Sequence, residues 1–393
     1  MRRLLAAMLT LLVLFSLAAC GAPPTPEEPV PPVQEELPAV EPPPPATEPE
    51  PPADPVEELL TSMTLEEKVG QLFFVRCPAE NAAEDVSAYH LGGYILFGRD
   101  TKDKTADALI QTIQSYQDAA AVPLLIGVDE EGGTVVRVSS NPHLRASKFQ
   151  SPQKLFAGGG MEAVTADARE KDILLDALGF NVNLAPVADV STDPGDFIYA
   201  RAFGRDAAAT ADYVSAVTGR MRTDAMGSVL KHFPGYGSNA DTHTGIAVDD
   251  RPYEEFVNSD FLPFLAGMAA GGDTAAVLVS HNIVECMDAS LPASLSPAVH
   301  DILRTDLSFD GVVMTDDLAM DAVSAYAGDG AVAVMALEAG NDLVLTTDYR
   351  TQIPKVLEAV ENGTLEEAAI DTACRRVLRW KQALGLLPTE PEV

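Results

Sequence analysis

The chain has few basic residues for its size, and this scarcity narrows its possible partners. Its 393 residues include 26 lysines and arginines against 59 aspartates and glutamates, which gives a formal net charge of −33 at pH 7. Nucleic-acid binding depends on basic contacts to phosphate, and adhesion to an anionic membrane depends on basic patches. We therefore expect no nucleic acid among its partners and no direct adhesion of the folded part to a membrane.

Cysteine is also scarce. Besides Cys20, the chain has only Cys77, Cys286 and Cys374, which are odd in number and far apart in the sequence. Neither a Cys-x-x-Cys pair nor a histidine-rich cluster is present, so nothing indicates a metal site. We expect these three thiols to be buried as small apolar side chains, and we expect no metal and no cofactor.

The first apolar run is too short to span a bilayer. Arg2 and Arg3 precede the run Leu4–Leu17, whereas a spanning helix needs about 20 apolar residues. A charged start, a short apolar stretch and small residues before a cut are typical of an export signal, here residues 1–19. Leu-Ala-Ala-Cys20 resembles a bacterial lipobox, which implies lipidation of Cys20. A plain secretory signal with an incidental cysteine is the alternative.

Residues 20–55 lack lysine and arginine but are rich in proline and glutamate. Such a segment cannot bury enough apolar surface to fold, so we expect an extended, self-repelling spacer. A proline-rich recognition ligand is the alternative. Residues 56–393 have an ordinary globular composition and are expected to form one domain. We expect an exported monomer on the extracytoplasmic side, held at the cell membrane by its N-terminal lipid only.

Short apolar runs alternate with longer amphipathic stretches in this domain. The runs are residues 71–76, 93–97, 123–129, 181–186, 228–232, 276–281, 311–316 and 342–346. The helical stretches are 105–119, 162–178, 207–223, 253–269, 296–307 and 330–339, with 351–361 and 365–384 packed outside. Near-continuous apolar strands are typical of a parallel sheet buried on both faces. The pattern predicts a single (β/α)8 barrel of the TIM type, with a doubly wound open sheet as the alternative.

Polar side chains at the ends of these runs favour the barrel. The residues concerned are Asp129, Lys231, His232, His281 and Asp316. A barrel gathers the carboxyl ends of its strands around one pocket, whereas an open sheet spreads them along an edge. Asp241 also stands two residues before His243, an arrangement in which a carboxylate can orient an imidazole for proton transfer.

The run Lys-His-Phe-Pro-Gly-Tyr-Gly-Ser-Asn-Ala-Asp-Thr-His over residues 231–243 resembles the signature loop of the β-N-acetylhexosaminidases of glycoside hydrolase family 3. The resemblance extends to residues 63–71, 92–97, 127–137, 312–320 and 339–342. Two features depart from the family pattern. Tyr236 stands where a histidine is common, and the loop before Asp241 is one residue shorter than usual.

The resemblance implies a role for each site residue. Asp316 would be the nucleophile, although residue chemistry alone does not decide between it and Asp317. His243 would be the acid and base, held by Asp241. The non-reducing sugar would be bound by Asp129, Arg137, Arg201, Lys231 and His232.

The activity implied is that of a retaining exo-β-N-acetylglucosaminidase acting on cell-wall fragments or other amino-sugar oligosaccharides. Three alternatives stay open. They are a β-glucosidase or xylosidase of the same fold, an N-acetylglucosamine phosphorylase, and a sugar-binding lipoprotein without catalysis.

Overall fold

The computed structural model describes residues 54–239, 247–320, 323, 326 and 331–389. Cys20, Asp241 and His243 lie outside these residues. None of the described helices combines the length and apolar character that a membrane span requires.

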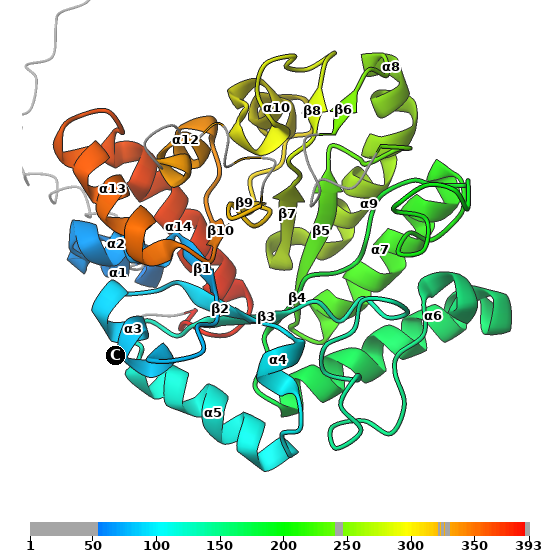
Figure 1. Cartoon of the computed structure of the whole chain (residues 1–393), viewed down its shortest axis with the longest axis horizontal. Coiled ribbons are helices and arrows are strands. Elements are labelled where there is room, and N and C mark those ends of the chain that lie inside the picture. The colour runs from blue at the N-terminus through cyan, green and yellow to red at the C-terminus, as the bar shows by residue number, and fades with distance from the viewer. Residues whose placement is uncertain (1–53, 240–246, 321–322, 324–325, 327–330, 390–393) are drawn as a thin grey trace, which may run out of the picture. The chain divides into compact units, whose positions relative to one another are not determined.

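Eight parallel strands form the centre of the fold (Figure 1). In chain order they are β1 (Phe73–Arg76), β2 (Gly93–Leu96), β3 (Leu125–Val128), β4 (Val182–Asn183), β5 (Gly227–Phe233), β7 (Ala275–Val279), β9 (Val313–Thr315) and β10 (Val344–Thr346). They are hydrogen-bonded in the order β10-β1-β2-β3-β4-β5-β7-β9. A parallel bridge between Met314 and Leu343 joins the two ends. The sheet is thus a nearly closed barrel, which confirms the predicted fold, and each strand overlaps one of the predicted apolar runs.

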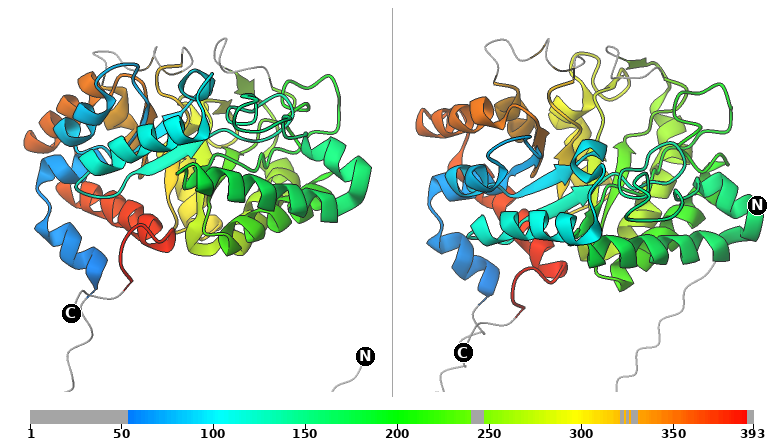
Figure 2. Two further views of the ribbon diagram at one scale, coloured as in Figure 1. Left: turned by 90° about the horizontal axis from the view of Figure 1, so that it is seen from below. Right: turned by 60° about the horizontal axis from the view of Figure 1, so that its bottom comes forward.

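Helices surround this barrel (Figures 1 and 2). They are α1 (Pro55–Ser62), α2 (Leu65–Gln71), α3 (Ala82–Tyr89), α4 (Gly98–Thr101), α5 (Ala106–Ala119), α6 (Pro152–Ala177), α7 (Ala207–Thr223), α8 (Tyr253–Glu255), α9 (Phe261–Gly271), α10 (Pro297–Asp301), α12 (Val332–Ala339), α13 (Tyr349–Glu361) and α14 (Glu367–Ala383). Single π-helical segments continue α8 over Phe256–Asp260 and α10 over Ile302–Asp306. A separate parallel pair consists of β6 (Val248–Asp249) and β8 (Ile283–Val284).

Local sequence accounts for several of these boundaries. Thr64 accepts a hydrogen bond from the amide of Glu67, and the Glu67 carboxylate accepts one from the amide of Thr64, so a full capping box opens α2. Helix α6 begins ten residues earlier than the sequence predicts. It runs through a kink at Gly159 and Gly160, whose backbone angles are not helical.

Two glycines leave room for an aromatic side chain in the barrel interior. A Cβ atom on Gly93 of β2 would lie 2.9 Å from the ring of Phe74, and one on Gly127 of β3 would lie 2.4 Å from it. The Phe74 side chain on β1 therefore passes β2 and reaches β3, which is possible only across the interior. Because side chains alternate along a strand, Arg76 and Asp129 share the inward face with Phe74 and Gly127.

One expectation about the cysteines is wrong. Cys77 and Cys374 are buried, but Cys286 is exposed. It follows the short strand β8 in a surface turn, so the apolar residues beside it in the sequence do not continue into the core.

Asn282 carries a buried polar side chain that has no hydrogen-bond partner among the described residues. Its side chain is fully buried after β7, and neither its amide nitrogen nor its carbonyl oxygen has a hydrogen-bond partner in the described part of the chain. Asn183 is the contrasting case, because its amide accepts from the backbone nitrogen of Glu130 at 3.0 Å and donates to the Glu130 carbonyl at 3.2 Å.

We predict that Asn282→Leu raises the free energy of unfolding by about 1–2 kcal/mol, because an unsatisfied buried polar group costs on the order of 1–3 kcal/mol. Asn183→Leu, the matched change, should lower it. Denaturant unfolding of the two variants checks this prediction. A loss of stability in Asn282→Leu comparable to that in Asn183→Leu would contradict it.

Lys381 on α14 is also fully buried, and its ammonium donates to the side-chain oxygen of Gln71 at 2.6 Å. No carboxylate among the described residues forms an ion pair with it. Burial lowers the pKa of Lys381 from 10.5 to about 7. Between these two values the unfolded chain holds one proton more at this site than the folded chain does.

We therefore predict that this group makes stability rise with pH between about 7 and 10.5, and that its contribution is lost as pH falls to 7. Lys381→Met should be more stable than the wild type at pH 7 and should show a smaller rise over this window. Thermal unfolding at several pH values measures both effects. Parallel pH curves for the two proteins would show that Lys381 is not depressed in this way.

Candidate active site

A buried ion cluster lies at the carboxyl ends of β3 and β5. The Lys231 ammonium is 2.7 Å from Oδ1 of Asp129 and 2.6 Å from Oε1 of Glu131. Lys231 and Glu131 are both buried, whereas Asp129 is partly exposed. Asp129 therefore presents the accessible carboxylate of the cluster.

Arg201 extends the cluster from the loop after β4. Its guanidinium binds Glu131 in a bidentate pair, with Nε at 3.0 Å from Oε2 and NH2 at 2.8 Å from Oε1. The same NH2 lies 3.1 Å from Nε2 of His232. A guanidinium can only donate, so Nε2 of His232 accepts and the ring proton is on Nδ1.

Asp189 fixes the other side of the His232 ring. Its Oδ2 is 2.7 Å from Nδ1 of His232, and its carboxylate also accepts from the backbone nitrogens of His232 at 3.1 Å and Tyr236 at 2.8 Å. We call the connected set Asp129, Glu131, Asp189, Arg201, Lys231 and His232 the charged network.

Mutual compensation keeps Glu131 and Lys231 ionised. Burial acts to raise the pKa of Glu131, but the nearby Lys231 and Arg201 cations outweigh it and hold that pKa below its usual range. Burial acts to lower the pKa of Lys231, but Asp129 and Glu131 together hold it above the ordinary value. Each of these buried charges is therefore stable only because an oppositely charged side chain lies next to it.

The loop after β3 directs three consecutive acidic side chains to different places. Asp129 and Glu131 point into the network, whereas the Glu130 carboxylate points away and accepts from the backbone nitrogens of Arg137 at 2.8 Å and Val138 at 2.7 Å. Glu130 is thus a structural residue that shapes the following loop.

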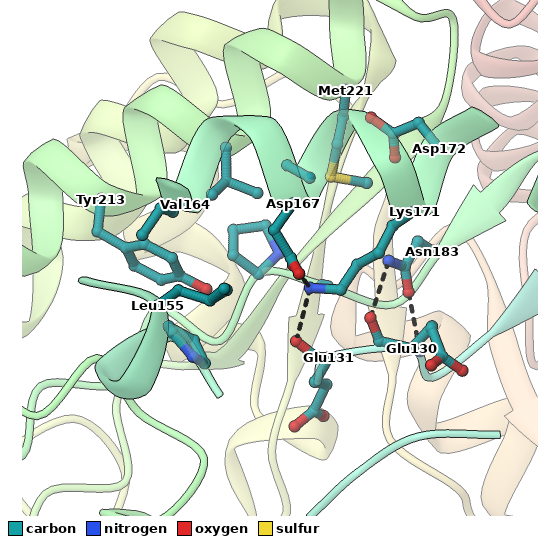
Figure 3. Close-up of a pocket in the computed structure, with 15 residues that line it drawn as sticks. Glu130, Glu131, Leu155, Val164, Asp167, Lys171, Asp172, Asn183, Tyr213 and Met221 are labelled. Atoms are coloured by element: carbon teal, nitrogen blue, oxygen red, sulfur yellow. Dashed lines mark hydrogen bonds and ion pairs between the residues drawn. The ribbon is translucent and has the colours of Figure 1, made fainter. Parts of the chain in front are cut away.

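Lys171 of helix α6 holds this loop in place (Figure 3). It reaches from α6, pairs with Oδ2 of Asp167 at 2.6 Å and donates to the backbone carbonyl of Glu131 at 3.2 Å. The cavity beside it has a volume of about 20 Å³, which is room for roughly one water molecule. It is therefore too small to be a sugar pocket.

Asp316 and Asp317 follow β9 at the same end of the barrel. Oδ1 of Asp317 accepts from the backbone nitrogen of Ala319 at 3.0 Å, which caps the turn after the strand. Oδ1 of Asp316 accepts from the backbone nitrogen of Asp317 at 2.8 Å. Nε2 of His281, at the end of β7, lies 3.1 Å from the Asp317 carbonyl. Asp317 thus has the capping role, and both acids remain partly exposed.

The structure brings together only some of the residues singled out in the sequence. Asp129, Arg201, Lys231 and His232 belong to the charged network, and Asp316 lies on another strand end of the same barrel face. The Arg137 side chain forms no hydrogen bond or ion pair with the described residues of the network, and its guanidinium lies 5.9 Å from the centroid of the Phe97 ring. Within the residues that the structure covers, no group of histidines, cysteines and acids is arranged to hold a metal ion.

Two members of the network, Glu131 and Asp189, were not recognised from the sequence. Asp129 and Glu131 are two residues apart in the sequence. Because side chains alternate along an extended chain, this spacing could have indicated that both acids lie on the same face. Asp189 gave a weaker signal, because it stands six residues beyond the end of β4.

We predict that Glu131→Gln lowers the free energy of unfolding by about 3 kcal/mol, because it leaves two buried cations with only part of their compensation. Sugar binding should weaken in the same variant, because Lys231 and Arg201 lose their common anchor. Denaturant unfolding and ligand titration measure the two effects. An unchanged protein by both measures would show that Glu131 does not hold the network together.

The family of the chain is clear from its relatives. The model of the glycosyl hydrolase family 3 N-terminal domain matches residues 64–380. The β-hexosaminidase LpqI of Mycobacterium tuberculosis is 34% identical over 330 residues, which are 80% of this chain and 82% of that protein. 

Similarity to solved structures supports the same family. The family 3 β-N-acetylglucosaminidase of Paenibacillus sp. str. FPU-7 superimposes with a TM-score of 0.76 at 32% identity, over 83% of this chain and 63% of that one. The β-N-acetylhexosaminidase of Beutenbergia cavernae gives 0.71 at 32% identity, over 82% and 99%. The family expected from the sequence is thereby confirmed, and the chain is a glycoside hydrolase of family 3.

Proposed function

We propose that the protein is a retaining exo-β-N-acetylglucosaminidase, which releases terminal β-linked N-acetylglucosamine from cell-wall fragments. The observation that carries this proposal is the charged network, which converges from three strand ends on one barrel face. Relatives named β-hexosaminidase and β-N-acetylglucosaminidase support the choice of sugar.

The network is suited to hold a sugar ring. The accessible oxygens of Asp129 can accept from sugar hydroxyls, while Lys231 and Arg201 are donors whose positions are already set by Glu131. Because the ion pairs exist before any ligand binds, little reorganisation accompanies binding. Charge-assisted hydrogen bonds of this kind contribute both affinity and a defined orientation of the sugar.

The proposed chemistry has two steps. In the first, Asp316 attacks C1 of the sugar, the glycosidic bond breaks, and His243 donates its proton to the departing oxygen. In the second, His243 takes a proton from water, the water oxygen attacks C1, and the bond to Asp316 breaks. Asp241 would keep the His243 ring in the required tautomer throughout.

The capping role of Asp317 supports the choice of Asp316 as nucleophile, because it leaves Asp316 as the other acid at this strand end. The roles of His243 and Asp241 rest on the family resemblance of their loop. Export, lipid attachment at Cys20 and a monomeric state belong to the same proposal and rest on the N-terminal sequence and composition.

We predict that Asp316→Asn lowers kcat on p-nitrophenyl β-N-acetylglucosaminide by about 10⁴-fold or more, because the variant lacks the nucleophile. Asp317→Asn, the neighbouring control, should retain turnover within about tenfold, since its role is capping. His243→Ala should lose roughly 10²- to 10⁴-fold. Initial rates of the full-length chain and its variants measure this, and wild-type turnover in Asp316→Asn would refute the nucleophile assignment.

The same assay separates the alternatives. Faster turnover of the β-glucoside or β-xyloside would indicate a different sugar preference. A phosphate-dependent rate with N-acetylglucosamine 1-phosphate as product would indicate a phosphorylase. A folded protein that binds N-acetylglucosamine but releases no product from any of these substrates would be a sugar-binding protein.

A further inference from the structure

His281, which stands just beyond the end of β7, is bonded through both of its ring nitrogens. Nε2 lies 3.1 Å from the carbonyl oxygen of Asp317, and Nδ1 lies 2.7 Å from the hydroxyl of Ser294. A carbonyl oxygen can only accept, so Nε2 carries the proton and the Ser294 hydroxyl donates to Nδ1. The side chains of His281 and Ser294 are both fully buried, so neither is exposed on the barrel face.

The bond from His281 extends the pairing of β7 with β9 beyond its last backbone hydrogen bond. In this pair Val279 lies opposite Thr315, and the amide of Asp316 donates to the Val279 carbonyl at 3.1 Å. Two residues further along each strand, the His281 side chain donates to the Asp317 carbonyl. The imidazole thus takes the place of a backbone donor at the point where the ladder ends.

The anchored residue is adjacent to the proposed nucleophile and hydrogen-bonded to it. The Asp317 amide donates to Oδ1 of Asp316 at 2.8 Å. The Asp317 carbonyl also accepts from the amide of Met320 at 3.0 Å, which closes the turn after β9. Hydrogen bonds therefore connect the His281 ring, through Asp317, to the carboxylate of Asp316. A shift of Asp317 would move the donor that orients the nucleophile.

The hydroxyl that orients the ring belongs to a well-anchored segment. Ser294 lies in the 3₁₀ helix Ala293–Leu295. Its amide donates to the Ser280 carbonyl at 3.0 Å, and its carbonyl accepts from Nδ2 of Asn341 at 2.8 Å. The His281 ring is therefore oriented by a serine whose own backbone is bonded on two sides.

We propose that His281, oriented by Ser294, is a positioning residue for Asp316. It holds Asp317 in the place where the Asp317 amide directs the Asp316 carboxylate toward C1 of the sugar. Attack depends strongly on alignment, and a displacement of about 1 Å costs about 100-fold in rate. This inference rests on the proposed function, because it requires Asp316 to be the nucleophile. It adds a residue that accelerates bond formation without contact with the substrate.

The test separates attack by Asp316 from proton transfer. The probe is an N-acetylglucosaminyl fluoride with a second fluorine on C5, which slows turnover of the covalent intermediate. As the Asp316 oxygen bonds to C1, the C1–F bond breaks and fluoride departs with the electron pair, so no general acid is needed. Mass spectrometry of the intact full-length chain measures the rate at which one sugar is added.

His281→Leu should lower the labelling rate constant at saturating probe by about 10- to 100-fold, because the carboxylate is no longer aligned. The probe concentration that gives half the maximal rate should stay within about twofold of the wild-type value, since no sugar contact is removed. A loss confined to the rate constant is the signature of positioning.

Three variants serve as controls. His281→Gln keeps an N–H donor and should retain the labelling rate within about fivefold. Ser294→Ala removes only the bond to Nδ1 and should give a smaller loss than His281→Leu. His300→Leu removes another buried imidazole, which donates to the Ser296 carbonyl at 2.8 Å, and it should label at the wild-type rate.

Hydrogen exchange distinguishes a local anchor from a general loss of stability. In His281→Leu the amides of residues 316–320 should exchange faster, while those of β3 keep wild-type protection. In His300→Leu the amides of residues 316–320 should stay protected.

The outcomes separate this inference from the proposed function. Wild-type labelling rates in His281→Leu, or equal losses in His281→Leu and His300→Leu, would overturn the positioning role alone. If His281→Leu does not fold, an unchanged rate in Ser294→Ala would overturn it. A wild-type chain that is not labelled on Asp316 would instead refute the proposed nucleophile, and the role of His281 with it.

Discussion

The structure of the active-site face depends on one buried carboxylate, that of Glu131. An isolated charge would be costly at this depth, and Glu131 is stable there because Lys231 and Arg201 bind it from two directions. These three residues come from the end of β3, the end of β5 and the loop after β4. One electrostatic requirement therefore fixes three separate segments of the barrel relative to one another.

Neutral and charged groups around Glu131 and His232 reinforce that arrangement. Asn183 holds the backbone of Glu130, Lys171 holds the carbonyl of Glu131, and Asp189 holds the His232 ring and the loop after β5. None of them needs to touch a substrate. Their effect is to set the donors before a ligand arrives, and for that reason the face can orient a polar ring without rearranging.

The cations on this barrel face differ in how they are paired. Around Glu131 every cation is paired with an acid, whereas Arg76 and Arg137 lie over the Phe97 ring and form no ion pair with a residue that the structure describes.

The sequence by itself determined the barrel, the position of its strands and of most of its long helices, and it indicated several residues of the candidate site. Strands buried on both faces must be apolar throughout, so all eight could be recognised, and polar residues at their ends indicated one common pocket. Tertiary structure alone decided that Glu131 rather than Glu130 enters the network, that Asp189 orients His232, that Arg137 pairs with Arg76 on Phe97, and that Cys286 is exposed. These outcomes depend on the path of a loop and on contacts between residues far apart in the chain, which no local pattern of residues specifies.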